Sequence, residues 1–503
     1  MQKKEKISST KITEKKISNP NSFFQFLNKK EQRIELGIFF SILLAIFILF
    51  ERFYPFLFTF PDTGMYIVSA VQGVHGGYRP MGFSNFLAFL NGINSSYYFF
   101  YLVQFWLLAA SSLFFILSVK YFYFSRLIQN TTTKGAYYLF AFFVLTSPSL
   151  IFCTKYVMTE VYFNVWTSVL LATAVWLLFR RNWLMLVIHI IALYLASQTR
   201  YIGMIYVVVS LFVFLFTFKE RKWVSILLLV CAVSATILSY NNTKNQMEKT
   251  FGVRMFSAFG GWTAANNVLV LMPEMKEISP EEIKCHMARY VHEEMVKIPD
   301  SLFCNERLLA TRYIWDNENS LKNVIFRYIN EFQMPYFRAW VRVGAFMRAY
   351  ANYWQKEMPI EFAKRFYLLN LGQVFKHFPI EQNLDFIPDQ TTKDFFNLSD
   401  DDKMEQFPTF FIDIDPLRKI GHYLLWIATG LALIIWGWKR KWFSAEQHKI
   451  LGIIALFCAA YIGASVIGHP INNFRYFLAI YIPNLFFVFA VLAIVLLKFS
   501  PKK

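Results

Sequence analysis

The side chains that could do chemistry in this chain lie in short polar segments between long apolar runs. In the first such segment, Asp62 follows the end of an apolar run and precedes the stretch "TGMYIVSAV". A carboxylate at the boundary between membrane and water can act as a general base, because partial desolvation strengthens its hold on a proton. The alternative for Asp62 is a structural role as the cap of a short helix formed by the residues after it.

A second polar segment, "CTKYVMTEVYFN" at 153–164, contains Lys155 and Glu160. Glu160 falls about one turn inside an apolar run, where an unpaired charge in lipid is costly, so we expect it to be functional. The alternative is a salt bridge between Lys155 and Glu160, although a spacing of five residues suits one helix face less well than a spacing of four.

An Arg–Tyr dipeptide opens each of two later apolar runs, as Arg200-Tyr201 and Arg475-Tyr476. Arginine can hold a phosphate through paired hydrogen bonds, so both dipeptides are candidate anion sites. The tyrosines have an alternative place in the aromatic belt at a membrane interface. His469 is a further candidate phosphate contact, and its alternative is a solvated side chain.

The composition indicates a membrane protein. The chain has 503 residues, of which 56% are hydrophobic and 17% are charged, and its mean hydropathy is +0.36. Soluble proteins average about 25% charged residues. The apolar content excludes a disordered chain and argues against a nucleic-acid partner, despite the formal net charge of +18. Basic residues of a chain like this are typically concentrated in cytoplasmic loops.

Ten apolar runs are candidate membrane spans, since a helix needs about 20 mostly apolar residues to cross a bilayer. They cover residues 36–59, 97–119, 136–153, 157–179, 183–198, 201–218, 223–240, 420–438, 450–468 and 476–497. With both termini in the cytoplasm, the cytoplasmic segments hold 24 Lys and Arg residues. The four short outer loops hold one basic residue each: Arg79, Lys155, Arg200 and Arg475. This asymmetry predicts an integral protein of the cytoplasmic (inner) membrane with these four residues on its extracytoplasmic face.

We therefore predict an all-α polytopic membrane protein with a large, mostly helical extracytoplasmic domain between spans seven and eight. Cys285 and Cys304 both fall in that domain, where a disulfide between them is possible. Its stretch 323–354 alternates aromatic residues with arginines, which predicts an amphipathic helix on the membrane surface, or alternatively a packed helix of the domain. The predicted parts are a basic tail (1–35), a seven-span module (36–240) with its first outer loop (60–96), the outer domain (241–419), three final spans (420–498) and a short tail (499–503).

The order of these motifs resembles the C-type (GT-C) integral membrane glycosyltransferases. The similarity rests on an Asp after the first span, "YRPMGF" in the first loop, "TE" entering the fourth span, "TRYIG" entering the sixth and a late "RYFLAIYIP". The nearest group in this pattern is the protein mannosyltransferases and lipid A aminoarabinose transferases, which use polyprenyl-phosphate sugars. In that family the first seven spans form a common module, with short juxtamembrane helices in the first outer loop.

The resemblance implies an enzyme of cell-envelope glycan synthesis that moves a sugar from a polyprenyl-phosphate donor to a hydroxyl of a lipid, glycan or protein acceptor. Asp62 would be the general base of an inverting displacement, and Glu160 the second acidic residue. The donor phosphate would contact Arg79, Arg200, Arg475 and His469. Further substrate contacts would come from Tyr66, Tyr78, Lys155, Tyr201 and Tyr476.

No cofactor is implied, and a divalent metal lacks support because the first loop has a single Asp with no acidic neighbour. Asp413-x-Asp415 matches the sequence of a metal-binding motif of enzymes that use nucleotide sugars. Such motifs end a strand in a domain of alternating strands and helices, and no such alternation precedes this one, so we do not interpret it as a metal site. Two alternatives stay open. One is a polysaccharide polymerase or ligase acting on lipid-linked glycans. The other is a flippase or transporter of lipid-linked sugars, although such proteins tend to show two related halves with charges at the membrane midplane.

Overall fold

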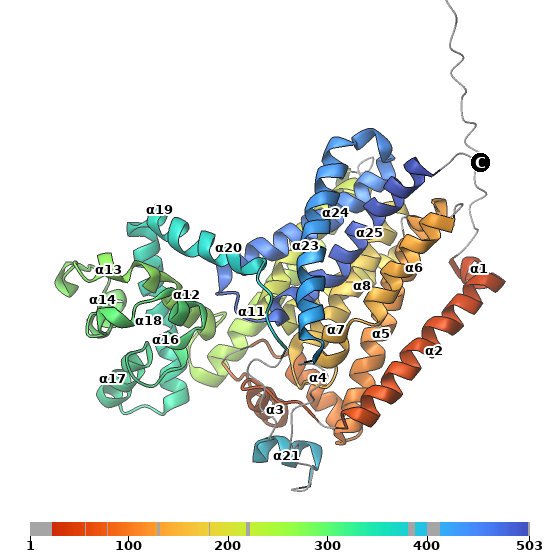
Figure 1. Cartoon of the computed structure of the whole chain (residues 1–503). Coiled ribbons are helices and arrows are strands. Elements are labelled where there is room, and N and C mark those ends of the chain that lie inside the picture. The colour runs from red at the N-terminus through yellow and green to blue at the C-terminus, as the bar shows by residue number, and fades with distance from the viewer. Residues whose placement is uncertain are drawn as a thin grey trace, which may run out of the picture.

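The computed structural model describes residues 23–55, 57–77, 79–127, 131–180, 182–217, 222–380, 388–399 and 413–500 (Figure 1). Within these ranges the regular elements are helices, and the β-type pairing is limited to an isolated bridge between Phe58 and Tyr156. The predicted all-α fold class is therefore confirmed.

Eight helices in the described part of the chain are long and apolar enough to cross a membrane, which makes this a polytopic membrane protein. They are α2 (Lys30–Phe53), α5 (Tyr97–Phe122), α6 (Thr131–Leu145) continued by α7 (Pro148–Cys153), α8 (Thr159–Phe179), α11 (Lys222–Phe251), α23 (Asp415–Trp438), α24 (Ala445–Gly468), and η8 (Phe474–Phe477) continued by α25 (Leu478–Phe499).

Two of the ten predicted spans are shorter apolar helices. One is α9 (Trp183–Thr199), and the other is η2 (Tyr201–Ile205) continued by α10 (Tyr206–Thr217). The total of ten spans thus stays a prediction, whereas eight helices meet the length and composition of a span. Short helices α1 (Phe23–Leu27), η1 (Phe124–Arg126) and η7 (Arg440–Trp442) lie next to the ends of the apolar helices.

The third predicted span is broken where α6 ends and α7 begins. Pro148 opens α7, a position where a missing backbone N–H does no harm.

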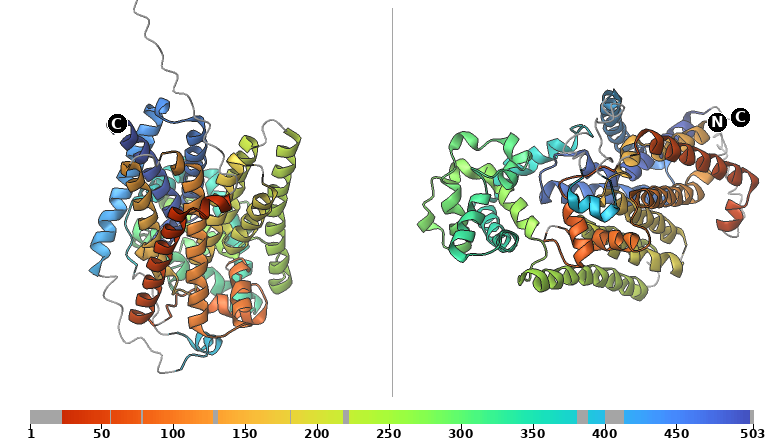
Figure 2. Two further views of the ribbon diagram at one scale, coloured as in Figure 1. Left: turned by 90° about the vertical axis from the view of Figure 1, so that its right-hand side faces the viewer. Right: turned by 90° about the horizontal axis from the view of Figure 1, so that it is seen from below.

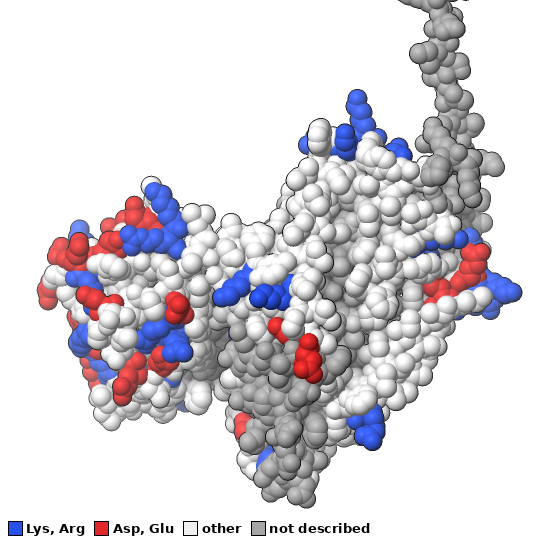
Figure 3. Space-filling model, in the orientation of Figure 1, with Lys and Arg blue, Asp and Glu red and all other residues white. Residues whose placement is uncertain are grey.

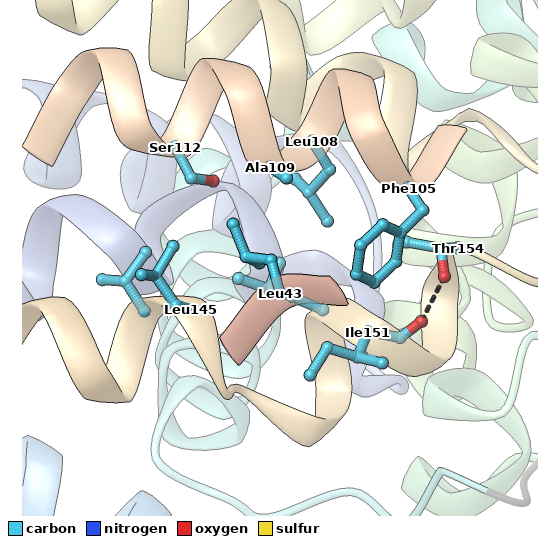
Figure 4. Close-up of a pocket in the computed structure, with 10 residues that line it drawn as sticks. Leu43, Phe105, Leu108, Ala109, Ser112, Leu145, Ile151 and Thr154 are labelled. Atoms are coloured by element: carbon cyan, nitrogen blue, oxygen red, sulfur yellow. Dashed lines mark hydrogen bonds between the residues drawn. The ribbon is translucent and has the colours of Figure 1, made fainter. Parts of the chain in front are cut away.

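Beside this break, side chains from α2, α5, α6 and α7 surround a void of about 20 Å³, which Figure 4 shows in close-up. Its lining is mostly apolar, and the Thr154 hydroxyl at its edge donates a 2.5 Å hydrogen bond to the Ile151 carbonyl oxygen. The void is a packing gap with room for about one water molecule.

Helix α8 is the centre of the bundle. Its apolar stretch is 83% buried inside the protein, whereas that of α23, at the periphery, is 6% buried. Side-chain hydrogen bonds join neighbouring helices to the core of the bundle, from Trp176 to Ser118 on α5 (3.0 Å) and between Thr167 and Tyr206 on α10 (2.9 Å). A charged residue on α8 must therefore find its partners within the protein.

Helix α2 is held to the bundle by an ion pair near each of its ends. Glu35 pairs with Lys120 of α5 and also accepts a 2.7 Å hydrogen bond from the Tyr137 hydroxyl. Glu51 pairs with Lys155. Both pairs are largely shielded from solvent, where losing one partner would leave an uncompensated charge.

Three short helices lie together at one end of the bundle: α3 (Thr63–Gln72), α4 (Gly82–Asn91) and α21 (Gln390–Phe396) (Figure 1). The loops 153–159, 199–206 and 468–478 adjoin the same end, which is called the site end below. Helix α21 packs there through a 5.6 Å ring contact between Phe396 and Phe100.

Residues 258–374 form a second helical unit, the α12–α20 domain, to one side of the bundle (Figures 1 and 2). It has its own hydrophobic core, which includes the buried rings of Trp262, Trp340 and Trp354. Its start differs from the predicted boundary at 241, because α11 continues as one helix to Phe251. Its helices are α12 (Ala258–Val268), η3 (Leu269–Leu271), α13 (Met272–Met275), η4 (Pro280–Glu282), α14 (His286–Met295), η5 (Asp300–Leu302), α15 (Asn305–Leu309), α16 (Arg312–Trp315), α17 (Lys322–Phe332), α18 (Tyr336–Glu357), α19 (Pro359–Phe362), η6 (Ala363–Tyr367) and α20 (Leu368–Val374).

The predicted amphipathic surface helix at 323–354 is wrong. This stretch forms two helices, α17 and α18, and α18 is the central helix of the domain core, with Trp340, Met347 and Trp354 fully buried. Tyr328, Trp340, Tyr350 and Trp354 of this stretch point into the domain core, whereas Phe326, Phe332, Tyr336 and Phe337 are exposed and do not form one continuous helix face. The possible disulfide is also absent, since Cys285 and Cys304 are both free thiols.

Charge is distributed unevenly over the molecule (Figure 3). Lys, Arg, Asp and Glu gather over the α12–α20 domain and at the ends of the bundle helices, while the visible flank of the bundle is mostly uncharged. This is the pattern expected of a helical bundle surrounded by lipid with a water-exposed domain attached to it.

The contact between α12 and α18 gives a test of the domain core. A methyl group added at Gly261 would overlap with the carbonyl oxygen of Gly344, whereas one added at Gly372 of α20 meets open space. We expect Gly261→Ala to destabilise the protein by about 1–3 kcal/mol, and Gly372→Ala to be neutral or stabilising by up to about 1 kcal/mol. Thermal unfolding of the detergent-solubilised full chain measures both, and equal melting temperatures for the two variants would contradict this packing.

Candidate functional site

A cavity of about 530 Å³ lies between the site end of the bundle and the α12–α20 domain. Its size is that of a pocket for a small-molecule ligand. The bundle supplies the loop before α3, α3 itself, the loop before α4 and the segment 469–476. The domain supplies residues from α12, from the turn before α16 and from the start of α18. The lining residues from the bundle that bear chemistry are Asp62, Tyr66, Arg79, His469, Asn473, Arg475 and Tyr476.

Asp62 lies at the N-terminus of α3 but does not cap it. Its side chain makes no capping hydrogen bond; instead the Thr63 hydroxyl accepts the Phe60 backbone N–H at 2.9 Å. The Asp62 carboxylate accepts a 3.2 Å hydrogen bond from Arg79, whose guanidinium lies 4.8 Å from the centre of the Phe259 ring. The capping alternative is therefore wrong, and the carboxylate faces the cavity beside an arginine.

Glu160 is the shared partner of two arginines from distant parts of the chain. It occupies the first turn of α8, and its Oε1 accepts hydrogen bonds from Arg200 (3.3 Å) and lies 3.4 Å from Arg475 Nη1. The side chain is only 2% exposed and does not line the cavity. The alternative salt bridge with Lys155 is wrong, because Lys155 pairs with Glu51.

Several buried polar atoms beside the cavity have no hydrogen-bond partner among the described residues. They include Nε of Arg475 and Nδ2 of Asn473, both donors, and Oε2 of Glu160. The backbone N–H of Arg475 is bound by the Asn473 amide oxygen at 3.2 Å, which orients that amide with its donor group free. A buried donor left unpaired costs about 1–3 kcal/mol, so native sites normally satisfy such groups with a ligand or water.

Burial neutralises the histidine of the site. It lowers the pKa of His469 to about 4, and the charges of Arg200 and Arg79 act in the same direction. The ring contacts that of Tyr476, with 4.2 Å between the ring centres and an angle of 34° between the planes. At neutral pH His469 can therefore contact a phosphate as a hydrogen-bonding group, but not as the cation that a phosphate site would favour.

The predicted tyrosine contacts differ in their positions. Tyr66 and Tyr476 line the cavity, and burial raises the pKa of Tyr66 to about 12, so that its hydroxyl stays protonated. Tyr201 does not line the cavity and packs against Phe256 at 4.6 Å. Tyr78 lies outside the described residues.

Lys155 is separated from the cavity and has a structural environment. It is fully buried, paired with Glu51, and lies 3.7 Å from the centre of the Tyr101 ring. Burial lowers its pKa to about 8. Its single positive charge is thus used to attach α2 to the loop between α7 and α8.

Metal binding finds no supporting cluster. Among the described residues there is no group of three His, Cys, Asp or Glu side chains placed to hold a metal ion. In the Asp413-x-Asp415 sequence, the Asp415 carboxylate pairs with His377 at 3.1 Å and with Arg418. Asp415 begins α23 rather than ending a strand.

Sequence reasoning missed the side of the cavity formed by the α12–α20 domain. This side contributes the aromatic rings of Phe259, Trp315 and Phe337. Nothing in the local sequence distinguishes them from the many other aromatic residues of the chain. It also missed Asn370 of α20, which binds the backbone at Val466, His469 and Ile471 and so fixes the segment that leads to Arg475.

Comparison with family models, curated proteins and solved structures finds no match to this chain. The function is therefore argued from the site itself.

The pairing of Glu160 with two arginines predicts that removing the Glu160 carboxylate strongly destabilises the protein. Glu160→Ala leaves Arg200 and Arg475 buried without their counter-ion, and we expect a loss of about 3–5 kcal/mol. The control is Glu361→Ala, an exposed glutamate of α19, which should stay within about 0.5 kcal/mol of the wild type. Chemical denaturation in detergent gives both values, and a Glu160→Ala protein as stable as the control would contradict the shared ion pair.

The neutral His469 predicts acid sensitivity with a defined sign. Its pKa of about 4 lies below the unfolded value of about 6.5, so the unfolded chain binds the proton more readily. Stability should be complete above about pH 6.5 and fall as the pH drops toward 4. Because His469→Gln removes this group, its melting temperature should decline less than that of the wild type over the same range. Parallel declines would show that His469 is not responsible.

Proposed function

We propose that this protein is a membrane glycosyltransferase of the GT-C kind. It would move a sugar from a polyprenyl-phosphate donor to an acceptor hydroxyl at the extracytoplasmic face of the membrane. The observation that carries the proposal is the set of unpaired buried donors, Arg475 Nε and Asn473 Nδ2, beside a cavity that also contains a carboxylate. Donors without acceptors favour an acceptor-rich ligand, and a phosphate has oxygen acceptors together with a matching charge.

The charge balance of the site favours a phosphate with a single negative charge. Three arginines, Arg79, Arg200 and Arg475, face the two carboxylates of Asp62 and Glu160, and three minus two leaves one positive charge. His469 adds none at neutral pH. A phosphodiester, the form in which a sugar is linked to a polyprenyl monophosphate, carries one negative charge. A pyrophosphate-linked donor carries more, so this balance favours the transferase over the polymerase or ligase.

The location of the cavity suits a lipid-linked donor. It lies where the apolar helices end, so that an isoprenoid tail could stay in the bilayer while its phosphate reaches Arg475. The low number of basic residues in the loops at this end supports an extracytoplasmic site, with both termini in the cytoplasm. The short helices α3 and α4 in the first loop agree with the GT-C resemblance.

In the proposed mechanism the arginines stabilise the leaving phosphate and Asp62 takes the acceptor proton. Arg475, which lines the cavity, neutralises the charge that develops on the phosphate as the bond to the sugar breaks, while Arg200 lies outside the lining and adds positive charge beside Glu160. Glu160 is a positioning residue for both, since it is buried behind them and does not line the cavity. Donor phosphate also competes with Asp62 for Arg79, and a carboxylate oxygen released from this pair is available to accept the hydroxyl proton.

The test is transfer of labelled sugar from polyprenyl-phosphate donors by the full chain in membranes. General base assistance contributes roughly 10²- to 10⁴-fold, so Asp62→Asn should lose transfer by about that factor while donor binding is retained. Arg475→Ala should weaken donor binding as well. The matched control is Asp300→Asn, an exposed carboxylate of the α12–α20 domain, which should transfer at the wild-type rate.

Two outcomes would overturn the proposal. Full transfer by Asp62→Asn would remove the carboxylate from the chemistry. If no form of the protein consumed donor, but the wild type moved intact donor across the bilayer of reconstituted vesicles, the protein would be a flippase.

A further inference from the structure

The α12–α20 domain presents three aromatic rings to the cavity, two of which are exposed. Trp315 is 43% exposed and Phe337 is 52% exposed, and both line the cavity together with Phe259. Exposed aromatic rings that gather in one concave site typically mark a binding surface.

These rings are held in place by the domain core. Phe259 stacks on Trp315 (5.9 Å between ring centres) and on Trp340 (6.5 Å), and Trp340 in turn stacks on Trp262 (5.5 Å). Trp262 and Trp340 are buried, and the Trp262 indole N–H donates to the Trp340 carbonyl oxygen at 3.1 Å. The ring of Trp315 therefore extends a rigid stack that begins in the core, so little ordering is needed when a ligand binds.

Polar groups accompany the rings. Thr263 and Thr311 line the cavity, and their hydroxyls already donate to backbone oxygens, at 3.0 and 2.7 Å, so each can still accept a hydrogen bond. Asn472 also lines the cavity, and its Nδ2 donates one hydrogen bond to the Leu309 carbonyl oxygen at 3.0 Å, so its amide oxygen and its second N–H can still bond to a ligand.

An aromatic face beside hydrogen-bond acceptors matches a sugar ring. The C–H bonds on one face of a pyranose carry a partial positive charge, which the negative face of an aromatic ring attracts, while the hydroxyls at the edge donate hydrogen bonds. An isoprenoid tail would leave these acceptors unused and desolvated. We propose that Phe259, Trp315 and Phe337 form the subsite for an acceptor sugar, so that the acceptor is a glycan. This rests on the proposed transferase function.

The position of the proposed base, Asp62, favours the acceptor over the donor sugar as the ligand of these rings, because the acceptor hydroxyl must reach this carboxylate. Arg79 lies between Asp62, at 3.2 Å, and the ring of Phe259, at 4.8 Å. The residues proposed to hold the donor phosphate belong to the bundle, whereas the rings belong to the domain. In the reaction, the acceptor oxygen bonds to the anomeric carbon and Asp62 takes the hydroxyl proton. The carbon–oxygen bond to phosphate breaks, and its electron pair leaves with the lipid phosphate.

The test measures sugar binding without any transfer. Saturation-transfer NMR on the full chain in nanodiscs would use methyl glycosides of glucose, mannose, galactose and N-acetylglucosamine as probes. We expect at least one probe to bind the wild type. Trp315→Ala and Phe337→Ala should weaken that binding by roughly three- to tenfold, and Trp315→Phe by less, because it keeps an aromatic face. Phe326→Ala, an exposed ring of α17 outside the cavity, is the matched control and should bind as the wild type does.

The possible outcomes separate this inference from the proposed function. Absence of binding by every probe, or binding that Trp315→Ala and Phe337→Ala leave unchanged, would overturn the subsite. Displacement of the glycoside by a polyprenyl-phosphate sugar, but not by farnesyl phosphate, would assign the rings to the donor sugar and overturn the acceptor inference. Binding that depends on Trp315 in a protein with no transfer activity would uphold a sugar site and contradict the transferase instead.

Discussion

The structure of the site depends on one buried carboxylate with two arginine partners. Glu160 on α8 contacts Arg200, where α9 ends, and Arg475, where α25 begins, so three parts of the bundle are joined at one oxygen atom. Two positive charges so close together repel, and Glu160 offsets that repulsion while leaving one positive charge in excess. The Arg475 ring contact with Phe60, at 3.8 Å, extends the same fixed arrangement to the loop that carries Asp62. Without this ion pair there would be neither a defined cavity nor a defined charge in it.

The cavity itself arises because two hydrophobic cores meet there without merging. The bundle core and the α12–α20 core are two clusters that adjoin at few residues: Met247 of α11 belongs to the domain core, Val374 of α20 belongs to the bundle core, and Tyr367 packs against both. Two surfaces formed by independent cores rarely fit perfectly, and here the gap is lined by charge from the bundle and by aromatic rings from the domain. This division gives a physical reason for two different ligand chemistries in a single cavity. It also explains why Asn370 matters, since it binds the bundle segment 466–471 from the last helix of the domain.

Much of the fold follows from composition, while the site depends on contacts that composition does not contain. Ten apolar runs are predicted to be membrane spans, because burial in lipid leaves few structures other than helices, and among the described residues eight of them are helices long and apolar enough to cross a membrane. The basic residues Arg79, Arg200 and Arg475 were expected on one face and are near one another. The ion-pair partners of the basic residues in the outer loops were not predictable. Lys155, for example, pairs with Glu51, 104 positions away, rather than with Glu160. Likewise the "YRPMGF" and "TRYIG" glycines allow close approach, Gly82 to Gln198 and Gly203 to Ala196, which a motif alone does not reveal. The arginine-rich stretch of α18 misled because alternation of aromatic and basic residues fits a domain core as well as a membrane surface.

The pair between Asp62 and Arg79 gives the proposed mechanism an order of events. Without donor, Arg79 donates a hydrogen bond to the carboxylate at 3.2 Å, so one carboxylate oxygen is already engaged. Burial alone would lower the pKa of Arg79, but the charge and hydrogen bond of the neighbouring Asp62 carboxylate outweigh it and the net shift is upward, so Arg79 stays charged through any proton transfer nearby. When an anionic phosphate enters, it brings a second negative charge to the same guanidinium, and Asp62 loses part of its compensation. In the proposed mechanism, the carboxylate oxygen that Arg79 releases is then available to the acceptor hydroxyl. Since an acceptor on the domain side would meet this carboxylate across Arg79, the geometry links the availability of the base to donor occupancy without requiring any movement of the backbone.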